Sequence, residues 1–144
     1  MSQIKSVEIR LGTSEDAQQI KAIETDSSRE SLIESELAAK TVTVVQEDGI
    51  IVGYSVLNLS FFRKPTLELL MVASDRRRKG IGRKLLQNAL STVKAGDTLW
   101  TSTNQSNVPM QRLLEDEGFQ KSGKVENLDP GDPEIVYCKQ VVET

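Results

Sequence analysis

The sequence predicts a mixed α/β fold, with a mostly antiparallel central sheet of about seven strands flanked by about four helices. Two β-branched runs joined by Asp-Gly at residues 48–49 predict a hairpin in the first half. In the second half, an apolar run at residues 66–72 leads through a basic, glycine-containing turn into an amphipathic helix. Strand and helix patterns follow in the order β-α-α-β-β-β-α-β-α-β-β without repeat or linker. We therefore expect a single domain over residues 1–144.

The composition is that of a soluble globular domain with one core. The chain has 144 residues, of which 38% are hydrophobic and 27% are charged. Its net charge of −3 disfavours a general nucleic-acid-binding protein, which would usually be basic. Because the chain has one cysteine, an intrachain disulfide framework is excluded. Because it has no histidine, the commonest general base is missing. Residues 1–5 lack an apolar signal core and no run approaches the ~20 residues of a membrane span, so we expect a cytoplasmic protein without a membrane partner.

The first half of the chain predicts one strand and two helices before the hairpin. Residues 7–11 alternate apolar and polar side chains, as a half-buried strand does. A hydroxyl followed by acids at residues 13–16 is typical of a helix start, and residues 27–30 have the spacing of a capping box. The two helices carry apolar stripes made of Ala17, Ile20, Ile23, Leu32, Ile33 and Leu37.

The hairpin consists of strands at residues 41–47 and 50–59. The Asp-Gly pair between them suits a turn in which both positions need positive φ. Gly53 inside the second strand indicates a bulge. Residues 61–65 are expected to form a connection to the next strand.

The strand at residues 66–72 is followed by a helix at residues 80–94. The apolar stripe of this helix consists of Ile81, Leu85, Leu86, Ala89, Leu90 and Val93. Beyond it the patterns predict a strand at residues 98–103 and a helix at residues 109–118, which begins near Pro109 and ends at Gly118. Two last strands are expected at residues 119–125 and 134–142.

The junction between strand 66–72 and the following helix predicts an anion site. A helix start leaves backbone N–H groups without an acceptor, and the helix dipole is positive there. Four consecutive cations, at residues 76–79, lie at this turn, although a solvated basic turn is the alternative. A dinucleotide site is disfavoured because Leu85 stands where a third glycine belongs, and the Gly-Lys-Ser/Thr ending of a P-loop is missing.

Residues 72–82 resemble the acetyl-CoA-binding signature of the GNAT superfamily of N-acetyltransferases. The core of that signature, Arg/Gln-x-x-Gly-x-Gly/Ala, corresponds here to Arg77-x-x-Gly80-x-Gly82. The family also has an Asn that opens the next helix eleven residues before a Gly-Phe pair, which matches Asn107 and residues 118–119. The order of predicted elements agrees with the family over nearly the whole chain.

The resemblance implies an enzyme that transfers an acetyl group from acetyl-CoA to a primary amine by direct attack, without a metal. The acceptor would be a small-molecule or peptide amine, and a homodimer stays open because many members form one. Turn amides would cradle the CoA pyrophosphate, and strand backbone would pair with the pantetheine arm. The implied cofactor-binding residues are Leu70, Met71, Val72, Arg77, Arg78, Lys79, Gly80, Ile81, Gly82, Arg83 and Asn107.

The reaction needs a general base, because an amine with a pKa of about 10.4 is almost fully protonated at neutral pH. Glu68 is the candidate, because it sits on the strand that would line the cleft, four residues before Val72. Its alternative role is a solvent-facing or strand-paired carboxylate. The Tyr that protonates the CoA thiolate in many members is replaced by Leu114, which leaves Tyr54, Tyr137, another hydroxyl, water or no acid.

Other residues keep further functions open. The acidic loop at residues 126–134 could attract a cationic amine or could simply be solvated. A non-catalytic acyl-CoA-binding or regulatory domain is the second function class, because Leu114 replaces the usual acid. A nucleic-acid-binding module using residues 76–79 is the third, and the acidic balance disfavours it.

Overall fold

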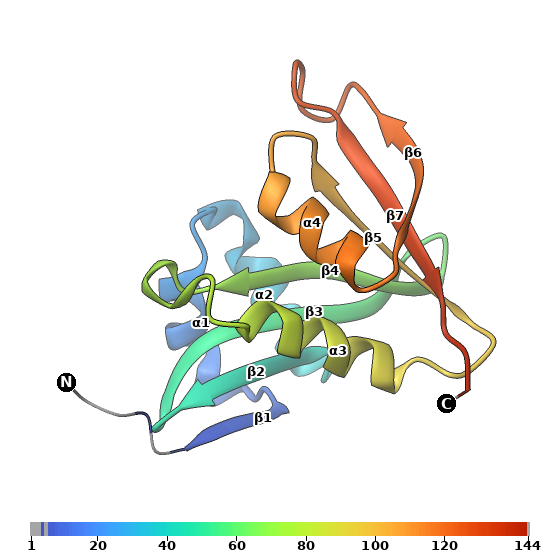
Figure 1. The fold of residues 1–144 in the computed structure, drawn as a ribbon. Helices are drawn as coiled ribbons and strands as arrows, with labels where there is room; N and C mark the ends of the chain where they lie inside the picture. The colour runs from blue at the N-terminus through green and yellow to red at the C-terminus, as the bar shows by residue number, and fades with distance from the viewer. Residues whose placement is uncertain (1–3, 5, 144) are drawn as a thin grey trace. The chain divides into compact units, whose positions relative to one another are not determined.

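The computed structural model describes residue 4 and residues 6–143, and confirms the predicted mixed α/β fold (Figure 1). Its seven-stranded sheet has the order β1-β2-β3-β4-β5-β7-β6. The helices and strands are β1 (Val7–Leu11), α1 (Ala17–Ile23), α2 (Glu30–Ala38), β2 (Val42–Glu47), β3 (Ile50–Phe61), β4 (Lys64–Val72), α3 (Ile81–Thr92), β5 (Thr98–Asn104), α4 (Val108–Asp116), β6 (Gln120–Val125) and β7 (Glu134–Gln140).

The chain divides into two compact units. The first comprises residues 1–57 and 69–89, and the second comprises residues 58–68 and 90–144. Strands β3 and β4 and helix α3 each continue from one unit into the other. The single domain over residues 1–144 stays a prediction.

None of the helices in the described part of the chain has the length and apolar character needed to cross a membrane. The expectation that no targeting segment is present rests partly on residues 1–3 and 5, which lie outside the described residues.

The β2–β3 hairpin has the turn and the bulge that the sequence predicts. Asp48 and Gly49 both adopt positive φ, at 49° and 85°. Val45 pairs with Gly53 but Gln46 pairs with Ile51, so the strand β3 holds one extra residue beside Gly53.

The first unit has an apolar core on each face of its strands. Because side chains alternate along a strand, Val44 of β2 packs on the α1 and α2 side while Val45 packs on the α3 side. Gly53 lets α3 approach closely, since a Cβ there would lie 3.0 Å from Cγ2 of Ile81 and 3.1 Å from the Met71 carbonyl oxygen. The position of α3 on the sheet therefore depends on a residue without a side chain.

The capping box predicted at residues 27–30 is wrong. The helix start there is capped by Asp26, whose Oδ1 accepts from the Ser28 amide at 3.0 Å, because a carboxylate reaches the amide two residues on.

The connection predicted at residues 61–65 is present but shorter than expected. Strands β3 and β4 run up to a tight turn at Phe62 and Arg63, whose φ values are 52° and 61°. The sequence does not signal this turn because such residues rarely adopt positive φ.

In the second unit, α4 covers one face of the antiparallel strands β5 and β7 (Figure 1). Tyr137 of β7 is fully buried, and its hydroxyl donates to Glu115 of α4 at 2.9 Å. Strand β6 pairs with β7 on the far side from β5, and all its residues are exposed. The opposite face of the β5–β7 ladder carries Trp100 and Val136 and is described below.

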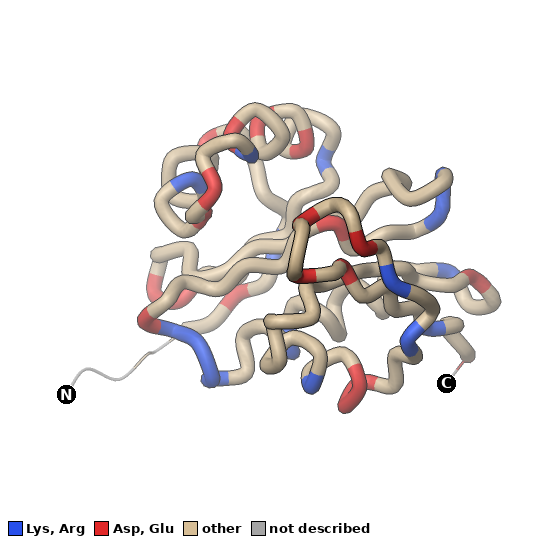
Figure 2. The backbone as a smooth tube through the Cα atoms, turned by 90° about the horizontal axis from the view of Figure 1, so that it is seen from above, with Lys and Arg blue, Asp and Glu red and all other residues tan. Residues whose placement is uncertain are grey.

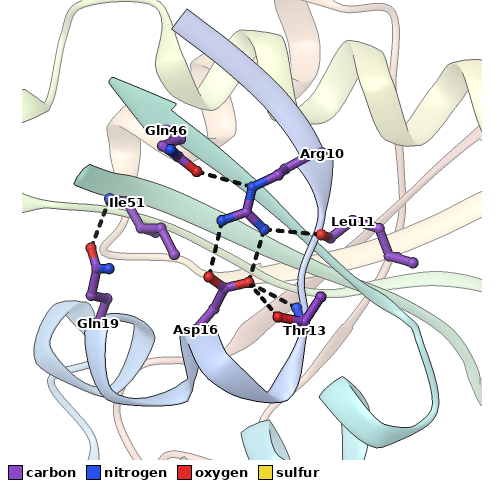
Figure 3. A network of polar contacts seen from close by, with 7 residues as sticks. All are labelled: Arg10, Leu11, Thr13, Asp16, Gln19, Gln46 and Ile51. Atoms are coloured by element: carbon purple, nitrogen blue, oxygen red, sulfur yellow. Dashed lines mark hydrogen bonds and ion pairs between the residues drawn. The ribbon is translucent and has the colours of Figure 1, made fainter. Parts of the chain in front are cut away.

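A partly buried ion pair joins β1 to the start of the first helix (Figure 3). The Arg10 guanidinium binds both carboxylate oxygens of Asp16 at 2.9 and 3.0 Å, and its Nε donates to Gln46 at 2.9 Å. The Asp16 side chain is only 9% exposed and also accepts from the Thr13 amide at 2.8 Å. These hydrogen bonds, first that from Arg10, hold the pKa of Asp16 below its usual value.

We expect Asp16→Asn to lower the free energy of unfolding by about 1.5–3 kcal/mol at neutral pH, because it leaves Arg10 without its charged partner. The lowered pKa means that the ionised carboxylate stabilises the fold above its unfolded pKa, and that this stability is lost as pH falls through the folded pKa. Urea unfolding at neutral and acid pH should therefore show a difference between variant and wild type that shrinks with acid. Asp97→Asn, at an exposed turn, is the control, and an equal effect there would contradict the assignment.

Candidate functional site

The turn between β4 and α3 has the backbone of an anion-binding cradle. Arg77 is extended, whereas Arg78 and Gly80 adopt left-handed φ values of 65° and 83°. Helix α3 begins at Ile81, and its first turn closes with the Lys84 amide donating to the Gly80 carbonyl at 3.0 Å. The amides of Ile81 and Gly82, in the first turn of the helix, precede any intrahelical acceptor, so they can bind an anion at the positive end of the helix.

The predicted run of four cations appears as one continuous blue stretch (Figure 2), but its members differ. Arg76 is half-buried and binds Glu47 at 3.0 Å and Asp75 at 3.0 Å, so its charge is already paired. The Arg77 Nε donates to the Val72 carbonyl at 3.3 Å. Arg78 and Lys79 are exposed. Arg76 is thus not the anion-facing cation that the sequence suggests, because two carboxylates hold it.

Leu70, Met71 and Val72 lie in the last part of β4, and their side chains alternate between two core clusters. Leu70 and Val72 pack with the core cluster of α3, whereas Met71 packs with the cluster of α1 and α2. The register between β4 and β5 covers only Thr66 with Trp100 and Leu67 with Thr101, although β4 continues to Val72. A ligand could therefore pair with the strand backbone beyond Leu67.

Glu68 follows these paired residues on β4 and is half-buried. Its Oε1 accepts from Nδ2 of Asn58 on β3 at 2.7 Å. The carboxylate lines a pocket of ≈220 Å³ in the second unit. A carboxylate in a partly enclosed pocket can accept a proton or hold a cation.

Asn107 caps α4, because its Oδ1 accepts from the Met110 amide at 3.2 Å. Asn104 instead holds the acidic loop, with Nδ2 donating to Asp129 at 2.9 Å. Leu114 is fully buried and offers no proton. Among the described residues, the side-chain amide nitrogen of Asn107 has no hydrogen-bond partner, whereas that of Asn104 donates to two groups of the acidic loop.

Both tyrosines considered as acids already donate their hydroxyl protons to carboxylates. Tyr54 binds Glu24, and Tyr137 binds Glu115. Burial and then the Glu24 hydrogen bond raise the pKa of Tyr54 far above its usual value. Burial and then the Glu115 hydrogen bond raise the pKa of Tyr137 to about 12. These phenols are poor proton donors, and neither suits the role of general acid.

The pocket beside Glu68 is the part of the site that the sequence does not reveal. Its lining comes from β3, β4, β5, β6, β7 and the loop before β7, including Phe61, Trp100, Leu128 and Val136. These residues are brought together by strand register, which depends on long-range pairing. The only sequence signal is that Trp100 is the chain's single tryptophan, placed on a predicted strand.

Comparisons with known proteins agree on one family. The family model "Acetyltransferase (GNAT) family" matches residues 10–119. A GNAT acetyltransferase structure from Bacillus cereus has 31% identity and a TM-score of 0.87, over 96% of this chain and 99% of that one. The ribosomal-protein-S18-alanine N-acetyltransferase of Escherichia coli has 21% identity and a TM-score of 0.84, over 96% of each chain.

A Salmonella typhimurium protein, solved with its cofactor acetyl-CoA, has 21% identity and a TM-score of 0.78, over 97% of this chain and 96% of that one. The last two likenesses concern the fold alone. No curated protein matches the sequence.

We expect Glu115→Gln to lower the pKa of Tyr137 from about 12, because it removes the carboxylate that accepts a hydrogen bond from the neutral phenol and repels the phenolate. The pKa should stay above that of a free tyrosine, since burial remains. An ultraviolet pH titration of tyrosinate measures it. Glu126→Gln, in an exposed loop, is the control. An unchanged titration in Glu115→Gln would contradict the pairing.

Proposed function

The chain belongs to the GNAT family of acetyltransferases, and we propose that it transfers an acetyl group from acetyl-CoA to a primary amine. The observation that carries the donor assignment is the cradle between β4 and α3, where Arg78 and Gly80 are left-handed and the first amides of α3 face outwards from the helix. The acetyl-CoA in the Salmonella neighbour supports the same donor.

The cradle amides from Arg78 to Arg83 would bind the CoA pyrophosphate, with Arg77, Arg78 and Lys79 adding positive charge. The backbone of Leu70 to Val72 would pair with the pantetheine arm, as an added strand would. Asn107 would hydrogen-bond the cofactor near its thiol end through its amide nitrogen. The donor is therefore recognised mainly by backbone groups, which do not depend on any single cation.

In the reaction, the amine nitrogen attacks the thioester carbonyl, the C–N bond forms, and the C–S bond breaks. Glu68, directly or through water, would take the proton that the ammonium must lose before or during attack. Amides near Met71 and Val72 would stabilise the oxyanion. A thiolate with an ordinary thiol pKa of roughly 8.5 is a good leaving group, so it can take its proton from water.

The acceptor would be a small-molecule or peptide amine. The E. coli neighbour, an alanine N-acetyltransferase for a ribosomal protein, supports attack by nitrogen.

Leu114 at the position of the usual acid favours a second candidate function, a domain that binds acyl-CoA without turnover. We infer one domain over residues 1–144, which acts in the cytoplasm; a homodimer stays open.

A thiol-release assay with acetyl-CoA and a panel of amines, paired with calorimetric acetyl-CoA titration, tests the function. We expect binding and release with at least one amine. Gly82→Glu should weaken acetyl-CoA binding by about tenfold or more, because a carboxylate at the helix start repels phosphate. Gln87→Glu adds the same charge farther along α3 and should bind normally. Binding without release for any amine would favour the second candidate, and no binding would contradict both.

Glu68→Gln should lower kcat by about 100-fold at neutral pH, because it removes the proton acceptor while keeping an oxygen for Asn58. The loss should shrink as pH rises, since more amine is then unprotonated in solution. Acetyl-CoA affinity should not change. Glu126→Gln is the control, as its exposed carboxylate lies near Lys124. If kcat in Glu68→Gln equals that of the control, Glu68 is not the base.

A further inference from the structure

The pocket beside Glu68 has its floor on one face of the β5–β7 ladder. Ser102 lies directly opposite Val136, and Trp100 lies two residues before Ser102 on the same strand. Because side chains alternate, these residues share one face, whereas Tyr137 points to the other face and binds Glu115 of α4. The floor therefore lies on the side of the ladder that α4 does not cover.

Apolar groups form most of the pocket walls. The rings of Phe61 and Trp100 are in contact, with centroids 5.4 Å apart. Val125 and Leu128 also line the pocket, and Leu128 is 66% exposed. A leucine and two aromatic rings in one lining provide apolar surface that a flat apolar group can cover.

The loop that carries Leu128 is held in place by polar contacts. Asp132 accepts from the Ser106 amide at 2.9 Å and from its hydroxyl at 2.5 Å. The Asn104 side chain donates to Asp129 at 2.9 Å and to the Asp132 carbonyl at 3.1 Å. Leu128 thus stands on a pre-formed wall, which lowers the entropy cost of binding a ligand there.

The charge of the pocket is negative. Glu68 and Glu134 line it, and no Lys or Arg does so among the described residues. The Glu68 carboxylate, whose partner Asn58 is neutral, attracts an ammonium group at this partly enclosed surface and repels a carboxylate.

The volume limits the ligand to a small molecule. The pocket measures ≈220 Å³, which is below the roughly 300–1,000 Å³ of pockets for drug-sized ligands. A polyamine would place a second cation among apolar groups such as Leu128 and Phe61. An amino acid would bring a carboxylate next to Glu68 or Glu134.

We propose that the acceptor is a small monoamine that carries an apolar, preferably aromatic, group and no carboxylate. Its ammonium lies at Glu68, and its ring lies between Trp100 and Leu128. This inference rests on the proposed function, because it names the acceptor of the same reaction.

Trp100 allows a test that does not require turnover. It is the only tryptophan of the chain and lines the pocket, so its emission reports ligand binding. The wild-type protein is titrated with 2-phenylethylamine, with L-phenylalanine, which adds a carboxylate, and with ethanolamine, which lacks the ring. We expect 2-phenylethylamine to bind about tenfold or more tightly than either of the others.

Two variants localise the effect. Glu68→Gln should weaken 2-phenylethylamine binding by about tenfold, and Leu128→Ala by about threefold, because they remove the ammonium partner and one apolar wall. Glu15→Gln, which removes an exposed carboxylate of the first unit outside the pocket lining, should bind like wild type. Equal binding of L-phenylalanine, tighter binding of spermidine or of a peptide, or unchanged affinity in both pocket variants would overturn the inference.

The same amines in the thiol-release assay separate the two proposals. Thiol release with amino acids, peptides or spermidine in preference to 2-phenylethylamine would keep the proposed function and overturn this inference. A selective Trp100 response to 2-phenylethylamine without thiol release for any amine would keep the pocket assignment and contradict acetyl transfer.

Discussion

The first unit depends on the close approach of helix α3 to strand β3 at Gly53. Any side chain at this position would meet Ile81 and the Met71 carbonyl oxygen at about van der Waals contact or closer. Ile81 is the first residue of α3, so the contact fixes where the helix begins. The left-handed turn at Arg78 and Gly80 follows from this placement, because the chain must leave β4 and enter a helix that already lies on the sheet. The outward-facing amides are thus a result of core packing.

Much of the fold follows from local signals in the sequence, and the exceptions have physical reasons. The Asp48-Gly49 turn and the strand, turn and helix at residues 66–92 are encoded by neighbouring residues, so they are predictable. The turn at Phe62 and Arg63 is not, because tertiary pairing overrides the backbone preference of both residues. The pocket is not predictable either, since it depends on which residue of β5 faces which residue of β7. The turn at residues 77–80 and the start of α3 are predictable from the pattern, whereas side-chain partners such as Asn58 are not.

Most of the carboxylates discussed above have structural hydrogen-bond or ion-pair partners, and Glu68 differs from them. Glu24 and Glu115 accept the hydroxyl protons of the two tyrosines, and Glu47 holds Arg76. Each of these three carboxylates is already bound to a tyrosine hydroxyl or an arginine, so it is a poor candidate for a catalytic base. Glu68 differs because its partner Asn58 is neutral, so its negative charge is not compensated by a cation in that contact. A cationic ligand that enters the pocket would neutralise the negative charge of Glu68.

The hydrogen-bonded loop before β7 has a consequence for how this family of sequences can diversify. Asp129 and Asp132 fix the loop backbone, while Leu128 between β6 and Asp129 packs against little and is largely exposed. A substitution at such an exposed position costs little folding stability. Selection could therefore exchange this side chain freely without disturbing the turn that precedes α3, which is encoded some fifty residues earlier in the chain. A change of acceptor preference could then arise in this loop while the fold of the scaffold is kept.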